Sequence, residues 1–185
     1  MPILGEQTCL CPENLLDEFA LEGAPRQWWV LYTRARQEKA LGRELLEYGV
    51  PFYLPLVKKA VRSRNRTITS YIPLFSGYLF LFGTEDERVR SLKTNRISRI
   101  LTVDDSERLV HDLRQLRQLI VSNAPLTVES RLVRGDRVRV KSGPFAGLEG
   151  TVLQRRGATR LMVAVNFLQQ GASVEIDDFL LEPLG

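Results

Sequence analysis

The run PLFSGYLFLF, residues Pro73 to Phe82, decides the fold of this chain because it is the most apolar segment. Its ten residues are too few for a membrane-spanning helix, which needs about 20, and its four aromatic side chains favour an extended, buried backbone. Side chains alternate along a strand, so Tyr78 and Phe80 share one face while Phe75 and Leu79 share the other. We therefore predict a central β-strand with two apolar faces, and we expect Phe75 and Tyr78, at its entry, to stay open for a partner protein.

Length and composition are those of an ordinary soluble protein of one large or two small domains. The chain has 185 residues, of which 44% are hydrophobic and 26% charged. Residues 1–27 carry five acidic side chains and one arginine, a net charge of −4. Because the whole chain has a net charge of +4, residues 28–185 carry a net charge of +8. A basic body favours a polyanion or an acidic protein surface as partner.

The cysteines exclude two kinds of site. Cys9 and Cys11 are the only cysteines, and His111 is the only histidine. These three residues are too few for a zinc site with four Cys or His ligands, and two such close cysteines do not form a disulfide framework. We expect reduced thiols, no metal or other cofactor, and no membrane partner. The first residues show no basic segment followed by an apolar one, so we expect no signal peptide and a cytoplasmic protein.

The first 123 residues alternate between strand and helix patterns. Residues 1–27 predict a poorly ordered acidic leader, with at most a brief helix between Glu13 and Leu21. A strand at Trp28–Thr33 precedes a helix, and a basic hairpin over residues 58–66 leads back into the central strand. A short helix near residues 85–92, a strand near 100–103 and a longer helix from residue 106 follow. We predict an α+β domain over 28–123, an antiparallel sheet with flanking helices.

The last third of the chain has only strand patterns. Residues 124–132 lack periodicity and predict an interdomain linker. Residues 133–185 hold five short β-prone runs separated by glycine-rich turns, which predicts a small five-stranded β-barrel.

Two segments carry a family resemblance. The run GDRVRVKSGPFAGLEGTV, Gly135 to Val152, resembles the KOW motif with its glycines and central aromatic residue. Residues 28–123 resemble the N-terminal domain of NusG-family transcription elongation factors, including the opening aromatic pair and the LFSGYLFL strand. The runs PLFSGYLF and FLLEPL look most like the specialised paralogues of the RfaH type.

The resemblance implies a non-enzymatic elongation or antitermination factor that binds RNA polymerase and suppresses pausing or termination. In that family an aromatic depression docks on the clamp helices of the largest polymerase subunit, and a second segment touches the opposite pincer. The family usually has proline where this chain has Ser76, a substitution that loosens the turn before Gly77. The matching polymerase-binding positions are Trp29, Pro73, Leu74, Phe75, Tyr78, Val89, Arg90 and Ser91.

Basic residues form two groups that could contact the displaced non-template DNA strand through phosphates, which give affinity without sequence information. A merely solvated basic surface would carry the same residues. The first group lies on or before the first helix and the second on the hairpin: Arg34, Arg36, Lys39 and Arg43, then Lys58, Lys59, Arg62, Arg64 and Arg66.

The KOW domain implies a further partner. In the family an apolar loop of this domain engages a ribosomal protein or the Rho termination factor, and the matching loop here is Phe167, Leu168, Gln169 and Gln170. Gln169 and Gln170 replace the family's glycine and basic residue, which argues against Rho. The alternative function is a ribosome-associated or RNA-binding KOW protein. We expect a monomer, and no nucleophile motif or phosphate-binding glycine loop suggests an enzyme.

Overall fold

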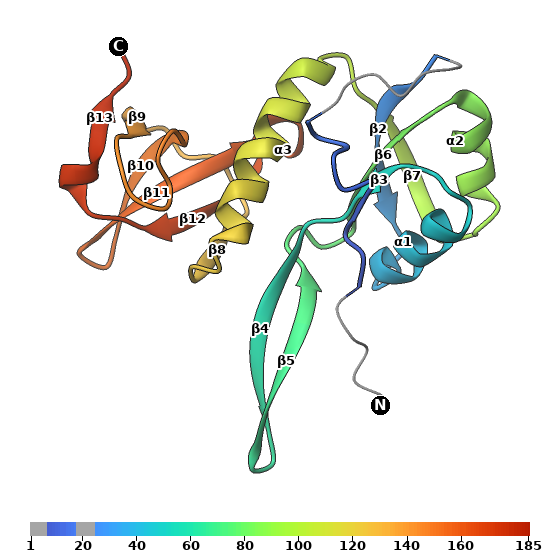
Figure 1. The fold of residues 1–185 in the computed structure, drawn as a ribbon, viewed down its shortest axis with the longest axis horizontal. Coiled ribbons are helices and arrows are strands. Elements are labelled where there is room, and N and C mark those ends of the chain that lie inside the picture. The colour runs from blue at the N-terminus through green and yellow to red at the C-terminus, as the bar shows by residue number, and fades with distance from the viewer. Residues whose placement is uncertain (1–6, 18–24) are drawn as a thin grey trace. The chain divides into compact units, whose positions relative to one another are not determined.

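The computed structural model describes residues 7–17 and 25–185, which divide into two compact units. The first unit ends at Ser106 and the second runs from Glu107 to Gly185 (Figure 1). Within these described ranges, no helix is long and apolar enough to cross a membrane.

The first unit is built on a five-stranded antiparallel sheet in the order β1-β3-β6-β2-β7. Its central strand β6, Tyr78–Gly83, confirms the predicted strand from Tyr78 onward, whereas residues 74–77 form a turn. The other strands are β1 (Leu10–Cys11), β2 (Gln27–Thr33), β3 (Phe52–Tyr53) and β7 (Ile97–Thr102).

Two helices belong to this unit, α1 (Glu38–Glu47) and α2 (Glu85–Leu92). Leu41 and Leu45, four residues apart on α1, pack with Leu79 and Leu81 of β6 in one fully buried cluster. The helix α2 begins in a capping box, in which the Thr84 side chain accepts from the Glu87 N–H and the Glu87 carboxylate accepts from the Thr84 N–H. These contacts fix the sheet that carries the candidate site.

The strands β4 (Leu56–Ser63) and β5 (Arg66–Pro73) form a separate two-stranded hairpin. The two strands pair in register over their whole length and close through Arg64 and Asn65. Figure 1 shows the hairpin extending well away from the sheet of its own unit. The predicted basic hairpin is confirmed.

The described part of the leader is ordered, which the sequence did not predict. Strand β1 pairs with β3, and the Leu54 N–H donates to the Cys9 carbonyl at 2.7 Å. Leu10, Leu15 and Leu16 are buried. Burial of three leucines and pairing with a sheet edge hold residues 7–17 against the domain. Residues 13–17 form turns, and the remainder of the expected brief helix lies outside the described residues.

The second unit contains a six-stranded antiparallel sheet in the order β13-β9-β10-β11-β12-β8. The expected α+β class with a small β domain at its end is confirmed: residues 133–185 contribute five strands, and β8, from the preceding residues, adds a sixth. The residues expected as a linker contain β8, which pairs with β12. The strands are β8 (Leu126–Glu129), β9 (Arg137–Val140), β10 (Glu149–Arg155), β11 (Ala158–Val165), β12 (Gln170–Glu175) and β13 (Leu181–Pro183).

The helix α3 (Ser106–Val121) groups with this second sheet, although its sequence predicts a place in the N-terminal domain. The Asp112 carboxylate accepts from the Asn166 backbone N–H and side-chain amide, both at 2.9 Å. The Gln115 side-chain oxygen accepts from the Glu149 N–H at 2.7 Å. The division into compact units thus falls between Ser106 and Glu107, before α3, whereas the domain boundary after residue 123 stays a prediction.

Candidate docking surface and basic hairpin

Tyr32 and Tyr78 form a partly exposed aromatic pair on the sheet of the first unit. They lie directly opposite each other on β2 and β6, and their ring centroids are 5.2 Å apart at an interplanar angle of 48°. Tyr32 is 42% exposed and Tyr78 is half-buried. A tilted aromatic pair that remains in contact with solvent offers a large, rigid apolar surface to a partner.

The turn before β6 makes room for this pair. Gly77 has a φ of +86°, and a Cβ atom there would lie 2.9 Å from a ring carbon of Tyr32. Any larger residue would therefore be strained and would displace the Tyr32 ring. The glycine is required by both the backbone conformation and the close approach of the ring.

Hydrogen bonds hold the same turn from three sides. The Gly77 N–H donates to the Glu38 carboxylate at 2.7 Å, and the Gly77 carbonyl accepts from the Thr33 N–H at 2.7 Å. The Tyr78 N–H donates to the Phe75 carbonyl at 3.2 Å. Ser76 was expected to leave this turn loose, but its neighbours fix it.

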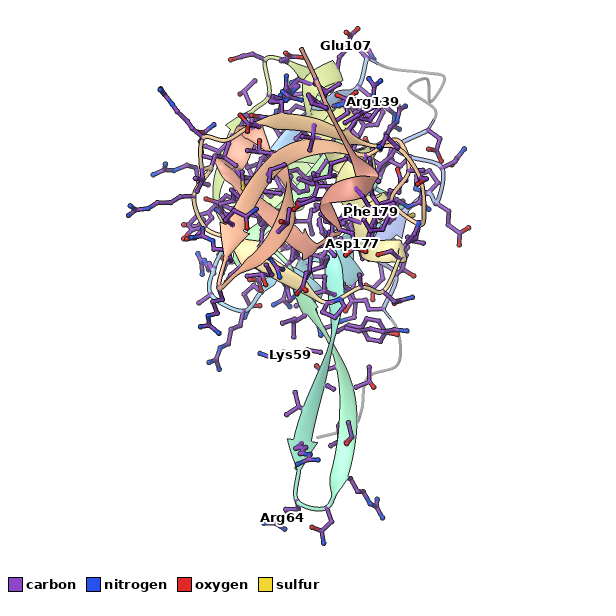
Figure 2. The ribbon with its side chains drawn as sticks, turned by 90° about the vertical axis from the view of Figure 1, so that its left-hand side faces the viewer. Lys59, Arg64, Glu107, Arg139, Asp177 and Phe179 are labelled. Atoms are coloured by element: carbon purple, nitrogen blue, oxygen red, sulfur yellow. The ribbon has the colours of Figure 1, made fainter. Side chains whose placement is uncertain are left out.

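The basic hairpin presents its cations on both faces. Lys58 and Arg62 share one face, and Lys59 and Arg66 the other, because the residues alternate along the paired strands. Arg64, at a φ of +41°, occupies the tip; Figure 2 labels it there, with Lys59 on the shaft. All five side chains are exposed.

The hairpin cations also differ from several other basic residues in their neighbours. In the described part of the chain, none of the five hairpin cations is within ion-pair distance of a carboxylate. Lys58 instead lies over the ring of Tyr71, with its Nζ 5.8 Å from the ring centroid. The hairpin therefore concentrates positive charge, and a bound anion would lower the electrostatic repulsion between these cations.

Comparison with known proteins identifies the family. A family model described as "Transcription termination factor nusG" matches residues 26–134, more than half of the chain, and one described as "KOW motif" matches residues 134–159. The chain belongs to the NusG family. Its general role is that of a transcription elongation factor, and the NusG and KOW domains are non-catalytic, in line with the expectation of a non-enzyme.

Solved structures give a more distant match. A chain of "Crystal Structure of MjSpt4:Spt5 complex conformation B" is 14% identical, with a TM-score of 0.29, and the match covers 86% of this chain and 97% of that one. A search of curated proteins finds no match.

The structure separates the polymerase-binding residues that the NusG resemblance indicated. Trp29 and Phe75 are only 3% and 1% exposed, and Leu74 is also buried. Trp29 packs in the cluster with Leu41, so it serves the core. Phe75 does not stay open as expected, and Tyr78 is the accessible aromatic of the predicted set; Pro73 is half-buried.

The second predicted polymerase segment lies on α2. Val89 is 43% exposed and Arg90 is also exposed. Ser91 is fully buried, and its hydroxyl donates to the Arg88 carbonyl at 2.6 Å. Ser91 is therefore part of the helix packing, and Val89 and Arg90 are the residues available to a partner.

Sequence reasoning missed Tyr32. Tyr32 lies on the same face of β2 as Trp28 and Val30, because every second residue of a strand points to the same side, so its face could be predicted. Its position opposite Tyr78, however, depends on the register between β2 and β6, which are about 50 residues apart in the sequence and are aligned only by the folded sheet.

The basic residues near α1 form a second, smaller cationic group. Lys39 and Arg43 are four residues apart on α1 and so share a helix face. Arg34 and Arg36 are exposed in the loop before the helix, Arg36 with a φ of +60°. Arg43 donates to the Gln7 side chain at 3.1 Å, which ties this group to the ordered part of the leader.

The predicted partner loop of the KOW domain is a 3₁₀ turn, Asn166–Leu168, followed by Gln169 in the left-handed conformation. Phe167 is 37% exposed and Leu168 is half-buried, whereas Gln170 begins β12. The carboxylate of Asp112 accepts two hydrogen bonds from Asn166 at the base of the loop. Phe167 is therefore presented on an anchored turn.

Two described titratable groups have a pKa shift with a simple physical cause. Burial raises the pKa of the Cys11 thiol, which lowers its thiolate fraction and hence its reactivity. Hydrogen bonding to Arg139 lowers the pKa of Glu149, as in an ordinary surface ion pair. Residues 7–17 and 25–185 contain no cluster of three or more His, Cys, Asp or Glu side chains that could hold a metal.

Proposed function

We propose that this NusG-family protein is an elongation and antitermination factor of the RfaH type that docks on the clamp helices of the largest RNA polymerase subunit. The observation that carries the proposal is the partly exposed Tyr32–Tyr78 pair on β2 and β6, beside a turn at Gly77 that Glu38 holds. Aromatic anchors at the centre of an interface contribute much of the binding energy, and a rigid turn lowers the entropy lost on docking.

A second contact would involve the opposite polymerase pincer. Val89 and Arg90 are exposed on α2, with Leu92 also 45% exposed on the same helix. A factor that bridges both pincers would hold the clamp closed and so oppose pausing.

The cationic groups would contact nucleic acid. The five exposed hairpin cations would provide phosphate contacts that need no base recognition, together with Arg34, Arg36, Lys39 and Arg43. The displaced non-template DNA strand is the ligand that we propose for these residues during elongation.

The KOW domain would recruit a ribosomal protein through Phe167 and Leu168. Phe167 is the exposed apolar residue of the loop, and the glutamines at 169 and 170 provide no positive charge beside it. This composition favours a ribosomal partner over Rho. The protein would act as a cytoplasmic monomer.

The test is affinity purification of the tagged protein from cells, with mass spectrometry of what co-elutes. We expect polymerase subunits with the native protein and their loss with the double variant Tyr32→Ala, Tyr78→Ala. The matched control is Tyr48→Ala, another exposed tyrosine of the same unit. Retention of polymerase by the double variant would refute docking through this pair.

The second candidate function is a ribosome-associated or RNA-binding KOW protein. The cluster of five exposed cations on the hairpin favours it independently of the tyrosine pair. Co-elution of ribosomal particles without polymerase in the same experiment would establish this alternative.

A further inference from the structure

Glu38 is an unusual acid because it is buried. It is 5% exposed, and among the described residues of the first unit it is the only buried carboxylate. A buried charge is costly unless it is hydrogen-bonded or placed in a favourable field. Glu38 has both: it accepts from the Gly77 N–H at 2.7 Å and stands at the first residue of α1, where the helix dipole favours an anion.

Gly77, the residue that Glu38 holds, lies next to both tyrosines of the aromatic pair. Gly77 directly precedes Tyr78, and its carbonyl accepts from the N–H of Thr33, which directly follows Tyr32. The pairing of β2 with β7 also shifts register between Tyr32 and Thr33. Such irregularities in a strand commonly redirect a neighbouring side chain. One carboxylate thus connects helix α1 to the backbone beside both rings.

We infer that Glu38 is a positioning residue: through Gly77 it sets the orientation of Tyr32 and Tyr78 for a polymerase partner. This inference rests on the function proposed above. Glu38 does not touch the partner, because it is buried beneath the turn. Its contribution is to keep the turn in the conformation in which the Tyr32 ring lies against Gly77.

The first measurement is independent of polymerase. In NMR spectra of the full chain, we expect Glu38→Ala to move the Gly77 amide resonance, to speed its hydrogen exchange, and to shift the ring resonances of Tyr32 and Tyr78. Glu38→Gln keeps an acceptor oxygen and should restore most of the native Gly77 protection. The control is Glu47→Ala, an exposed acid on the same helix, which should leave these signals in place.

The second measurement is a double-mutant cycle for polymerase binding, at a temperature at which every variant is folded. We expect Glu38→Ala to weaken binding about tenfold, the scale of losing one charge-assisted hydrogen bond. Combined with Tyr78→Ala, it should weaken binding less than it does alone, because one of the two rings that Glu38 positions is then already missing.

The outcomes separate the two claims. If Tyr78→Ala binds polymerase at native strength, the proposed function is wrong. The NMR spectra of the Glu38 variants still test, independently of polymerase, whether Glu38 positions the tyrosines. If Tyr78→Ala loses binding but Glu38→Ala leaves the Gly77 amide and both rings unchanged, the positioning role is wrong. Fully additive losses in the cycle would also overturn it.

Discussion

Neutralising the hairpin cations should reduce both the affinity for nucleic acid and its dependence on salt. The variant replaces Lys58, Lys59, Arg62, Arg64 and Arg66 with glutamine, and all five are exposed and without acidic partners in the described chain. Each phosphate that is neutralised releases counterions and adds about 0.9 to the slope of log affinity against log salt for a duplex, or about 0.7 for a single strand.

The arrangement of the cations on the two faces sets the size of the effect. A duplex lying along one face would meet two cations plus Arg64 at the tip, which predicts a slope of about 2.7 and a loss of about 40-fold in affinity between 50 and 200 mM salt. A ligand that contacts both faces would meet all five, which predicts a slope of about 4.5 and a loss of about 500-fold.

The assay is fluorescence anisotropy with labelled single-stranded and duplex DNA across this salt range. A matched control replaces five exposed cations elsewhere, Lys93, Arg131, Arg134, Lys141 and Arg156, so that the net charge changes equally. We expect the hairpin variant to lose most of the slope and the control to keep it. Equal slopes for native protein and hairpin variant would show that the hairpin is merely solvated.

Three further changes test the core, the turn and the second unit. Phe75→Ala should destabilise the first unit by about 3–5 kcal/mol, because truncating a buried aromatic side chain leaves a cavity. Tyr78→Ala should keep the melting temperature but weaken polymerase binding by at least about 1–2 kcal/mol. Similar losses of melting temperature in both variants would contradict the accessibility of Tyr78. Thr33→Val should leave the free energy of unfolding unchanged or raise it by about 1 kcal/mol, because the buried Thr33 hydroxyl has no hydrogen-bond partner in the described structure. A clearly lower free energy of unfolding in urea would show that the hydroxyl has a partner. Asp112→Ala should lower the free energy of unfolding by about 1–3 kcal/mol and speed hydrogen exchange of the Asn166 amide. The control is Glu107→Ala, an exposed acid on the same helix. Unchanged exchange in Asp112→Ala would show that α3 does not anchor the partner loop.

The sequence alone determined the local elements. The apolar run ending at Phe82 predicted the central strand, and five cations without an intervening acid predicted the hairpin. The glycine-separated runs after residue 133 predicted the second sheet. These predictions succeed because side-chain periodicity and turn residues act over a few neighbours in the chain.

The tertiary structure decided which residues of those elements are accessible. Both faces of the central strand are apolar, so periodicity could not show that Phe75 is covered while Tyr78 stays half-exposed beside Tyr32. The pairing of Tyr32 with Tyr78 joins residues 46 positions apart, and the hydrogen bond from the Gly77 N–H to the Glu38 carboxylate joins residues 39 positions apart. The placement of α3 with the second sheet likewise depends on side-chain hydrogen bonds to distant loops. Exposure and long-range pairing are properties of the packed chain, because they depend on which surfaces meet and not on the local sequence.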